Sequence, residues 1–446
     1  MSFSKKILAF AAVSALSAAT AVPAMALENE FHGLYRAFGF MTNAETGGGT
    51  FNFAKDAKTS SYVEQRARIM YIAKANDNLK LVTHFELDNR WGGQTGTKYQ
   101  TNDAGGLDAD QVTLETKNIY LDFNCPLTGA NVKIGMQPFS DAYKGVFGAF
   151  DGSGLVLSKK LDAFTPTFAY FRFNDNDYSA AVGAVGKQTE DMAVLDGKFA
   201  VNKDLTVGAS YYFVQRDLPA ASTTIAAENL HMLGVNAAAK FGPAAVDAYA
   251  AYQFGEFSGA RDLSAYMVGA NAKIKAGPGS VNVAALYLSG EDNVATGTTA
   301  DYGGFQTLAA GGAVSYYNPS NMWLLIRNGQ TINSSTAVIG TDLTVSGRGL
   351  MGLFAGYEGT AGKVFYNANI GYAATAEERG SEDGTLGTEV NATVGYKLYD
   401  NLAVSATAAY AFLGDGLNST TAATRIGGAS DADDPYLTAI QFNYTF

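Results

Sequence analysis

The feature that most constrains this chain is an alternation of apolar with polar or small residues, in segments of roughly ten residues, from Glu30 to the last residue. In the stretch 79–90, one face carries Leu79, Leu81, Phe85 and Leu87, and the other carries Lys80, His84, Glu86, Asp88 and Arg90. In a soluble sandwich the charged face would meet water outside and the apolar face a core. In a membrane barrel the apolar face meets lipid and the charged face lines the lumen.

The connections between these segments alternate in length. Short turns are predicted at 76–78, 202–204, 242–243, 277–279, 359–362 and 400–401. Longer polar connections are predicted at 92–110, 175–190, 217–228, 290–306, 376–386 and 414–434. Short turns at one end and long loops at the other are typical of the periplasmic and extracellular ends of a barrel. The sequence therefore predicts an all-β fold, a transmembrane antiparallel up-and-down β-barrel.

The predicted number of strands depends on the stretch 308–330. The count is about twenty if this stretch is a hairpin turning at 318–321, and about eighteen if it is a folded loop. Both numbers are even, as expected for a single-chain bacterial barrel. A barrel of this size is too wide for its wall side chains to fill, so it encloses a channel or a plug. No separate segment of plug size precedes the first strand, and the sequence therefore predicts a channel.

The first 26 residues predict export from the cytoplasm. Lys5 and Lys6 precede an apolar stretch, which ends in Pro23 and the small-residue pattern 24–26. This is a secretory signal peptide, 1–26, that leaves 27–446 as one barrel domain. The remainder has no apolar run near the ~20 residues of a membrane-spanning helix. Because the signal holds two lysines and no acidic residue, its removal takes the formal net charge from −11 to −13, which argues against nucleic-acid partners.

The last segment, 436–446, predicts the final strand of a barrel. One face carries Tyr436, Thr438, Ile440, Phe442, Tyr444 and Phe446. A chain that ends on an aromatic residue in this way resembles the signal that the outer-membrane assembly machinery reads. We therefore expect Tyr444 and Phe446 to form that signal, and the protein to lie in the outer membrane among lipid and lipopolysaccharide.

Together these features resemble the trimeric general porins of Gram-negative bacteria, and more closely the homotrimeric porins of sulfate-reducing bacteria. The resemblance covers essentially the whole mature chain, and its most specific part is the strand 131–138 with the following stretch 139–151. In porins the loop after the fifth strand folds inward and narrows the pore. The resemblance therefore implies an inward constriction loop in 139–151, with Asp141 and Asp151 as constriction acids and Tyr143 and Lys144 beside them.

Porins usually set such acids against a basic ladder on the facing wall. The resemblance implies that this ladder contains Arg66 and Arg68, on the same predicted face as Glu64, with Lys133, Arg172 and Arg36 as further candidates. Two simpler interpretations stay open: the basic residues are ordinary solvated lumen residues, and the two aspartates are turn formers beside glycines. The stretch 139–151 is short and holds few acids, which argues against strong charge selectivity.

The predicted function is non-enzymatic passive diffusion of ions and small hydrophilic solutes through a homotrimeric porin, without a cofactor. One alternative is a barrel platform whose long loops bind a partner. Another is a barrel hydrolase built around His84, which shares a strand face with Glu86 and Asp88. The three histidines are too scattered to predict a metal site. The acidic run 431–434 does not fit the spacing of an EF-hand, so it is interpreted as a solvated loop rather than a cation site.

Overall fold

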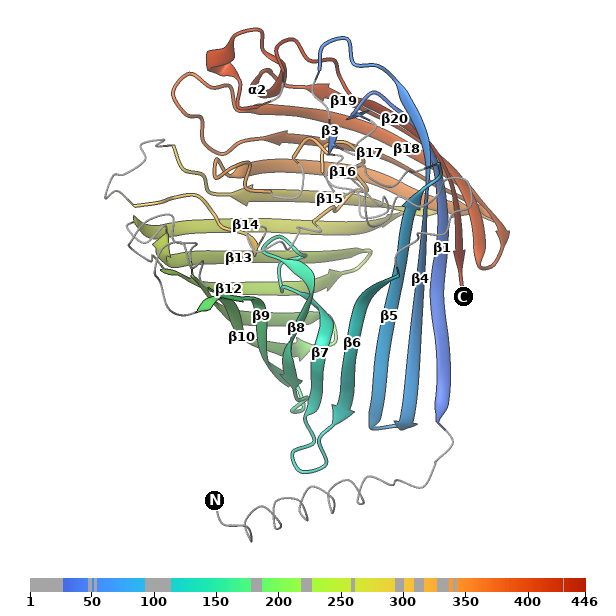
Figure 1. Ribbon diagram of the computed structural model, residues 1–446, viewed down its shortest axis with the longest axis vertical. Helices are drawn as coiled ribbons and strands as arrows, with labels where there is room; N and C mark the ends of the chain where they lie inside the picture. The colour runs from blue at the N-terminus through green and yellow to red at the C-terminus, as the bar shows by residue number, and fades with distance from the viewer. Residues whose placement is uncertain are drawn as a thin grey trace.

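The computed structural model describes residues 27–46, 50–51, 54–92, 114–177, 187–217, 227–257, 261–292, 301–308, 317–326, 337–339, 343–427 and 429–446. Within these residues, eighteen strands form one antiparallel sheet that closes on itself (Figure 1). They are β1 (Glu28–Thr42), β4 (Ser60–Asn76), β5 (Leu79–Arg90), β6 (Glu115–Asn124), β7 (Asn131–Ser140), β8 (Ala149–Ser158), β9 (Phe164–Asp177), β10 (Lys187–Asn202), β11 (Leu205–Asp217), β12 (Ala227–Phe241), β13 (Ala244–Phe257), β14 (Arg261–Ala276), β15 (Gly279–Leu288), β16 (Leu350–Ala361), β17 (Val364–Ala374), β18 (Thr385–Tyr399), β19 (Leu402–Leu413) and β20 (Tyr436–Thr445). The first connection contains the short pair β2 (Glu45–Thr46) and β3 (Thr50–Phe51), and the last contains α2 (Asp415–Asn418) and a 3-10 helix (Ala422–Thr424). The predicted signal peptide lies outside the described residues.

The ring closes where the first and last strands meet. On one side β1 pairs with β20, from Leu34 against Thr445 to Thr42 against Leu437, and on the other side it pairs with β4. Figure 1 shows β1 beside β4 and β5 on one side of this seam and β20 with β19 and β18 on the other. Closure gives every strand of the described ring a partner on both sides, which a membrane-spanning sheet requires because lipid offers no hydrogen bonds.

Side chains along each strand alternate between an outer and an inner face, as predicted. On β20, Ile440 and Phe442 are 57% and 46% exposed, whereas the neighbouring Ala439 and Gln441 are 5% and 9% exposed. Large exposed apolar side chains recur in this way on strands all around the ring. A continuous apolar outer band meets lipid tails in outer-membrane barrels. The predicted fold, a closed all-β barrel of the outer-membrane type, is confirmed.

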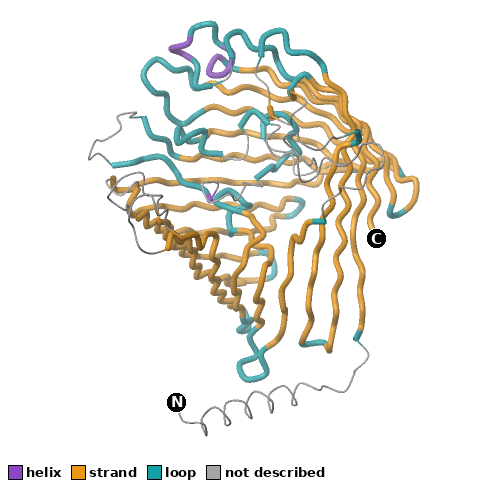
Figure 2. Tube along the Cα trace, in the orientation of Figure 1, coloured by secondary structure: helices purple, strands orange, loops and turns teal. Residues whose placement is uncertain are grey.

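The connections are sorted by length between the two ends of the barrel (Figure 2). Two-residue turns at 77–78, 203–204, 242–243 and 277–278 join strands at one end. The connections at the other end include 289–349 between β15 and β16, and 414–435 between β19 and β20. The predicted sorting of loops is confirmed.

The structure decides between the two predicted strand counts in favour of eighteen. The described residues of 308–330 contribute no strand, so the hairpin interpretation is wrong and the folded-loop interpretation is right. The predicted turn at 318–321 does exist. The Asn318 side chain closes it, because Oδ1 accepts from the Met322 N–H at 2.7 Å and Nδ2 donates to the Met322 carbonyl at 2.9 Å.

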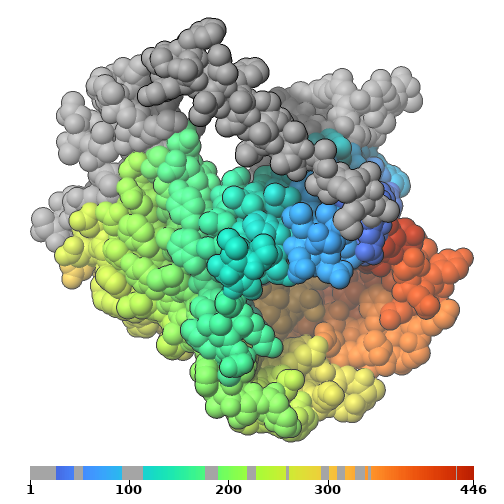
Figure 3. Space-filling view, turned by 90° about the horizontal axis from the view of Figure 1, so that it is seen from below, coloured from blue at the N-terminus to red at the C-terminus, as the bar shows by residue number. Residues whose placement is uncertain are grey.

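The interior of the barrel is partly filled, and by more than the predicted constriction loop. Inward side chains of β9–β18 form an apolar cluster with residues from two connections: Tyr143, Val146 and Phe147 from 141–148, and Phe305, Leu308 and Leu343 from 289–349. A second cluster joins Trp323 and Leu324 to Phe38 and Phe40 of β1 and to inward residues of β19 and β20. Seen from below, the molecule is hollowed between the blue-to-teal and the yellow-to-red strands, and the hollow ends on deeper atoms (Figure 3). The obstruction comes from inward-folded connections, which strand counting does not reveal.

Candidate functional site

The connection between β7 and β8, residues 141–148, follows the fifth strand of the ring and folds into the barrel, as predicted. Asp141 begins it, and its carboxylate accepts hydrogen bonds from the N–H groups of Tyr143 at 2.7 Å and of Gly145 and Gly148 at 2.8 Å. Burial raises the pKa of Asp141 above its usual value, against the lowering effect of these donors. The carboxylate therefore shapes the loop, which agrees with the interpretation of Asp141 as a turn former, and its role as a constriction acid stays a prediction.

Tyr143 and Lys144 fasten this loop to the inner wall. Tyr143 is fully buried, its hydroxyl is hydrogen-bonded to Ser210 Oγ, and its ring centroid lies 6.0 Å from those of Tyr212 and Tyr249. Burial raises the pKa of Tyr143 to about 12, so the hydroxyl stays neutral. Lys144 places Nζ 2.7 Å from Asp247 Oδ2 on β13. The loop thus covers the wall at β11–β13.

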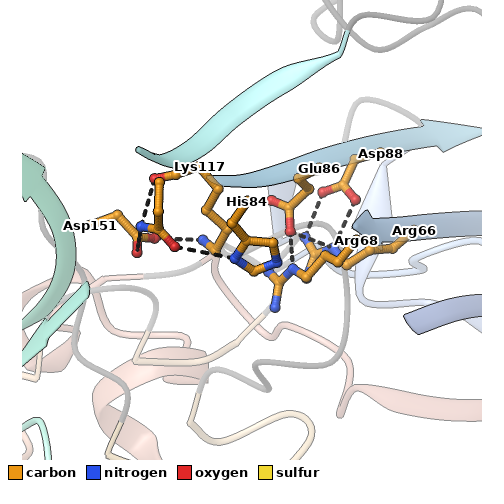
Figure 4. Close-up of polar contacts among 8 residues, drawn as sticks. Arg66, Arg68, His84, Glu86, Asp88, Lys117 and Asp151 are labelled. Atoms are coloured by element: carbon orange, nitrogen blue, oxygen red, sulfur yellow. Dashed lines mark hydrogen bonds and ion pairs between the residues drawn. The ribbon is translucent and has the colours of Figure 1, made fainter. Parts of the chain in front are cut away.

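Strands β4 and β5 bring charged side chains together on the inner face (Figure 4). The register sets Glu64 against Arg90, Arg66 against Asp88 and Arg68 against Glu86. All three pairs are ion pairs, and the middle one is bidentate, with Nε–Oδ1 at 2.7 Å and Nη2–Oδ2 at 2.5 Å. We call these six residues the charged wall. The predicted grouping of Arg66, Arg68 and Glu64 on one face is confirmed, but the cross-strand pairing was not predicted.

A chain of polar contacts extends the charged wall toward β8. Asp151 Oδ2 lies 2.6 Å from Lys117 Nζ, and Asp151 Oδ1 accepts from Asn118 Nδ2 at 2.7 Å. Asn118 Oδ1 lies 3.2 Å from His84 Nδ1 (Figure 4). Asp151 therefore lies within β8 and outside the loop 141–148, and its role as a constriction acid stays a prediction.

The hydrolase alternative finds no support in these contacts. His84 contacts an amide, while Glu86 and Asp88 contact arginines. A nucleophilic site needs a serine or cysteine within hydrogen-bond reach of a base. Among the contacts of the described residues, His84 has none of this kind.

The three further basic candidates take different positions. Arg36 lies on the inner face of β1, directly across from Arg66, and its Nε donates to Asn443 Oδ1 at 2.9 Å. Lys133 on β7 lies directly across from Asp122. Arg172 belongs to the outer face of β9, because the alternation buries Phe171 inside and exposes Tyr170 and Arg172 outside. There it pairs with Asp191 through two contacts of 2.8 Å, so its predicted place in the lumen is wrong.

Sequence reasoning missed Glu389 on β18. Its carboxylate is buried and accepts hydrogen bonds from the backbone N–H groups of Trp323, Leu324 and Leu325, in the connection between β15 and β16. The alternation of β18 marks Glu389 only as one more inward polar residue. No signal in the sequence shows which distant segment it contacts.

The C-terminal residues close the ring through their backbone. The Gly33 N–H donates to the Phe446 carbonyl at 2.9 Å, and the Phe446 N–H donates to the Gly33 carbonyl at 3.1 Å. The rings of Tyr444 and Phe446 stack at 5.7 Å and are partly exposed on the outer face. Their role as an assembly signal stays a prediction.

The acidic run 431–434 is engaged with the protein itself. Asp433 Oδ2 accepts from the Ala57 N–H at 2.9 Å, Asp434 Oδ1 accepts from the Leu413 N–H at 2.8 Å, and Asp431 pairs with Lys55. In the part of the chain that the structure describes, no three His, Cys, Asp or Glu side chains gather as a metal site would require. No helix in that part is long and apolar enough to cross a membrane.

Comparison with known proteins gives a clear likeness in fold and none in sequence. No family model and no curated protein matches the amino-acid sequence. The structure is similar to OpdO of Pseudomonas aeruginosa, with 12% identity, a TM-score of 0.56, and coverage of 94% of this chain and 97% of that one. It is similar to the outer membrane protein OpdK of Pseudomonas aeruginosa, with 9% identity, a TM-score of 0.56, and coverage of 94% and 98%. OccAB4 of Acinetobacter baumannii gives 12% identity, a TM-score of 0.54, and coverage of 94% and 98%. The chain therefore has the fold of these outer-membrane proteins over nearly its whole length, while the closer resemblance to porins of sulfate-reducing bacteria stays a prediction.

Proposed function

We propose that this protein is an outer-membrane porin that lets ions and small hydrophilic solutes diffuse passively through a narrowed lumen. The observation that carries the proposal is the division of the inner wall. Apolar clusters and inward-folded connections cover the strands from β9 to β20, whereas β4 and β5 present the charged wall. Water and hydrated solutes pass along charged and polar side chains rather than through a packed apolar core.

The arrangement also supports sieving by size more than by charge. The charged wall holds Arg66, Arg68 and Arg90 against Glu64, Glu86 and Asp88, so the three guanidinium groups balance three carboxylates. Arg36 adds one positive charge without a carboxylate partner among the described contacts. Paired charges create local fields without a large net potential, which favours weak selectivity.

Planar-bilayer recording of the purified protein tests the channel. We expect discrete conductance steps, and weak selectivity in reversal potentials measured under a salt gradient. A barrel that inserts and does not conduct would contradict the proposal and favour a platform for partner binding.

The homotrimer is part of the proposal and rests on the resemblance to trimeric porins. Gel mobility of unboiled against boiled protein, together with light scattering in detergent, tests it. A mass corresponding to three chains supports the trimer, and a monomer mass contradicts it. The channel proposal does not depend on this result.

A further inference from the structure

The carboxylate of Glu389 receives four hydrogen bonds, and three of them come from backbone that is not part of the barrel wall. Oε1 accepts from the Trp323 N–H at 2.8 Å and from Asn391 Nδ2 at 2.8 Å. Oε2 accepts from the Leu324 N–H at 2.9 Å and the Leu325 N–H at 2.7 Å. Glu389 has no ion pair with a cationic side chain among the described residues, and it is 0% exposed. A buried carboxylate without a cation is tolerated only where hydrogen-bond donors surround it, as they do here.

The segment that Glu389 holds, 322–326, lies inside the barrel and bridges two parts of its wall. Trp323 and Leu324 pack in the cluster with β1, β19 and β20, whereas Met322, Leu325 and Ile326 pack in the cluster lined by β9–β18. Five consecutive side chains are thus distributed between two apolar surfaces, and all five are buried. We call 322–326 the bridging segment.

A second polar side chain of β18 contacts the residue that precedes the bridging segment. Asn391, two residues along β18, donates to the Asn321 carbonyl at 3.2 Å, and its own oxygen accepts from Asn369 Nδ2 at 2.8 Å. On its other side, the bridging segment pairs with residues of its own connection, since Leu324 and Leu325 carbonyls accept from the N–H groups of Val338 and Ile339. Among the described contacts, Glu389 therefore makes the most hydrogen bonds between the bridging segment and the barrel wall. Without it, three backbone N–H groups in the interior would lose their acceptor.

We propose that Glu389 is a positioning residue that holds the bridging segment across the lumen and thereby sets the bore of the channel. The proposal rests on the proposed channel function. The interaction depends on a carboxylate in particular, because both oxygens must accept. A glutamine at this position would turn an NH2 group either toward Trp323 N–H and Asn391 Nδ2, or toward the N–H groups of Leu324 and Leu325.

The test is Glu389→Gln, which keeps the volume of the side chain and removes only its second acceptor. We expect a larger single-channel conductance than that of the wild type, and entry of larger neutral polyethylene glycols before the current is blocked. The matched control is Glu358→Gln on β16. It makes the same chemical change at an inward carboxylate that pairs with Lys273 and has no contact with the bridging segment. In this control we expect the polymer size limit of the wild type.

A folded Glu389→Gln barrel with the wild-type conductance and polymer limit would overturn the proposal. If this variant does not assemble, a second variant replaces 317–326 with a Gly/Ser linker of equal length and leaves every wall residue in place. That variant must also widen the pore, and an unchanged polymer limit would overturn the proposal as well. A wild type that never conducts, beside variants that do, would contradict the open-channel function but support the role of Glu389. If the wild type conducts and no variant changes the conductance or the polymer limit, the channel function is supported and the role of Glu389 is contradicted.

Discussion

At the scale of single residues, the charged wall balances its charges by pairing arginines with carboxylates across two strands. Arg66 and Asp88 illustrate this, since the bidentate contact satisfies both carboxylate oxygens and leaves little exposed charge. Removing one member of a buried pair leaves the other uncompensated. Because these charges are paired, a single substitution in the charged wall should change the electric field in the lumen. The same substitution among basic residues that are fully solvated would change it less.

Asp88→Asn should shift the channel toward anions. Arg66 would lose its bidentate carboxylate partner, keep its longer contact to Glu86 at 3.5 Å, and add positive potential to the charged wall. The measurement is the reversal potential in a salt gradient. Arg172→Gln on the outer face is the control, and we expect it to leave the reversal potential unchanged. Identical reversal potentials for Asp88→Asn and the wild type would show that the charged wall does not border the ion path.

Gly234 on β12 gives a second prediction, because a Cβ there would lie 2.1 Å from Tyr143 Oη and 2.7 Å from Tyr143 Cζ. Tyr143 is fully buried and cannot move aside freely. Gly234→Ala should therefore destabilise the barrel by about 1–3 kcal/mol through overpacking. A urea titration of the detergent-solubilised protein measures the change in free energy of unfolding.

A double-mutant cycle with Tyr143→Ala isolates this contact. In the Tyr143→Ala background only the Ala251 Cβ, 2.9 Å away, still lies close to the added Cβ, so Gly234→Ala should cost clearly less than in the wild type. An equal cost in both backgrounds would place the strain in the strand itself rather than at the loop 141–148.

At the scale of elements, the strands could be predicted from the sequence, whereas only one inward connection was expected, the loop after the fifth strand, and that from the resemblance to porins. The period of two follows from burial on one face and lipid on the other, so every strand carries the signal in its own residues. The bridging segment carries no such period. Its burial depends on partners that are far away along the chain, such as Glu389 and Phe38. Arg172 gives the opposite case. Its charge suggested a place in the lumen, but its position in the alternation of β9 puts it on the outer face.

The connections at the long-loop end are also joined to one another. Arg348, after the bridging segment, makes a bidentate contact with Glu382 in the connection between β17 and β18, at 2.8 Å and 2.7 Å. The hydrogen bond from Arg348 lowers the pKa of Glu382 below its usual value. A carboxyl with a lowered pKa in the folded state contributes stability above its unfolded pKa, and this contribution is lost as pH falls through the folded pKa.

Acid should therefore loosen these connections before it unfolds the barrel. We expect cleavage by an acid-active protease within 343–349 and 375–384 to rise as pH falls below the ordinary range of a glutamate. Glu382→Gln lacks the titrating group, so it should be cleaved readily at neutral pH and change little with acid. Equal pH dependence in the wild type and in this variant would contradict the prediction and assign the acid response to other carboxylates.

At the scale of the whole molecule, the last residue takes part in closing the ring. Phe446 exchanges two backbone hydrogen bonds with Gly33, and a Cβ at Gly33 would lie 2.3 Å from the Arg68 carbonyl and 2.5 Å from the Phe446 ring. The sequence predicts a second role for Phe446, as part of the signal for the assembly machinery. The two roles act at different stages, since a signal is needed only in the cell and a closing contact is needed wherever the barrel folds.

Deleting Phe446 separates the two roles. If it serves as a signal alone, the shortened chain should refold from urea into detergent micelles with the heat-modifiable gel mobility of the wild type, and fail to accumulate in the outer membrane of cells. If closure depends on it, the refolded yield and the urea midpoint should fall in both settings. Because the deletion removes two of the hydrogen bonds at the seam and leaves the pairing of β1 with β20 from Leu34 to Thr42 in place, we expect a small loss in micelles, about 1–3 kcal/mol, and a large loss in cells. Normal accumulation in cells would show that Phe446 is not required as a signal.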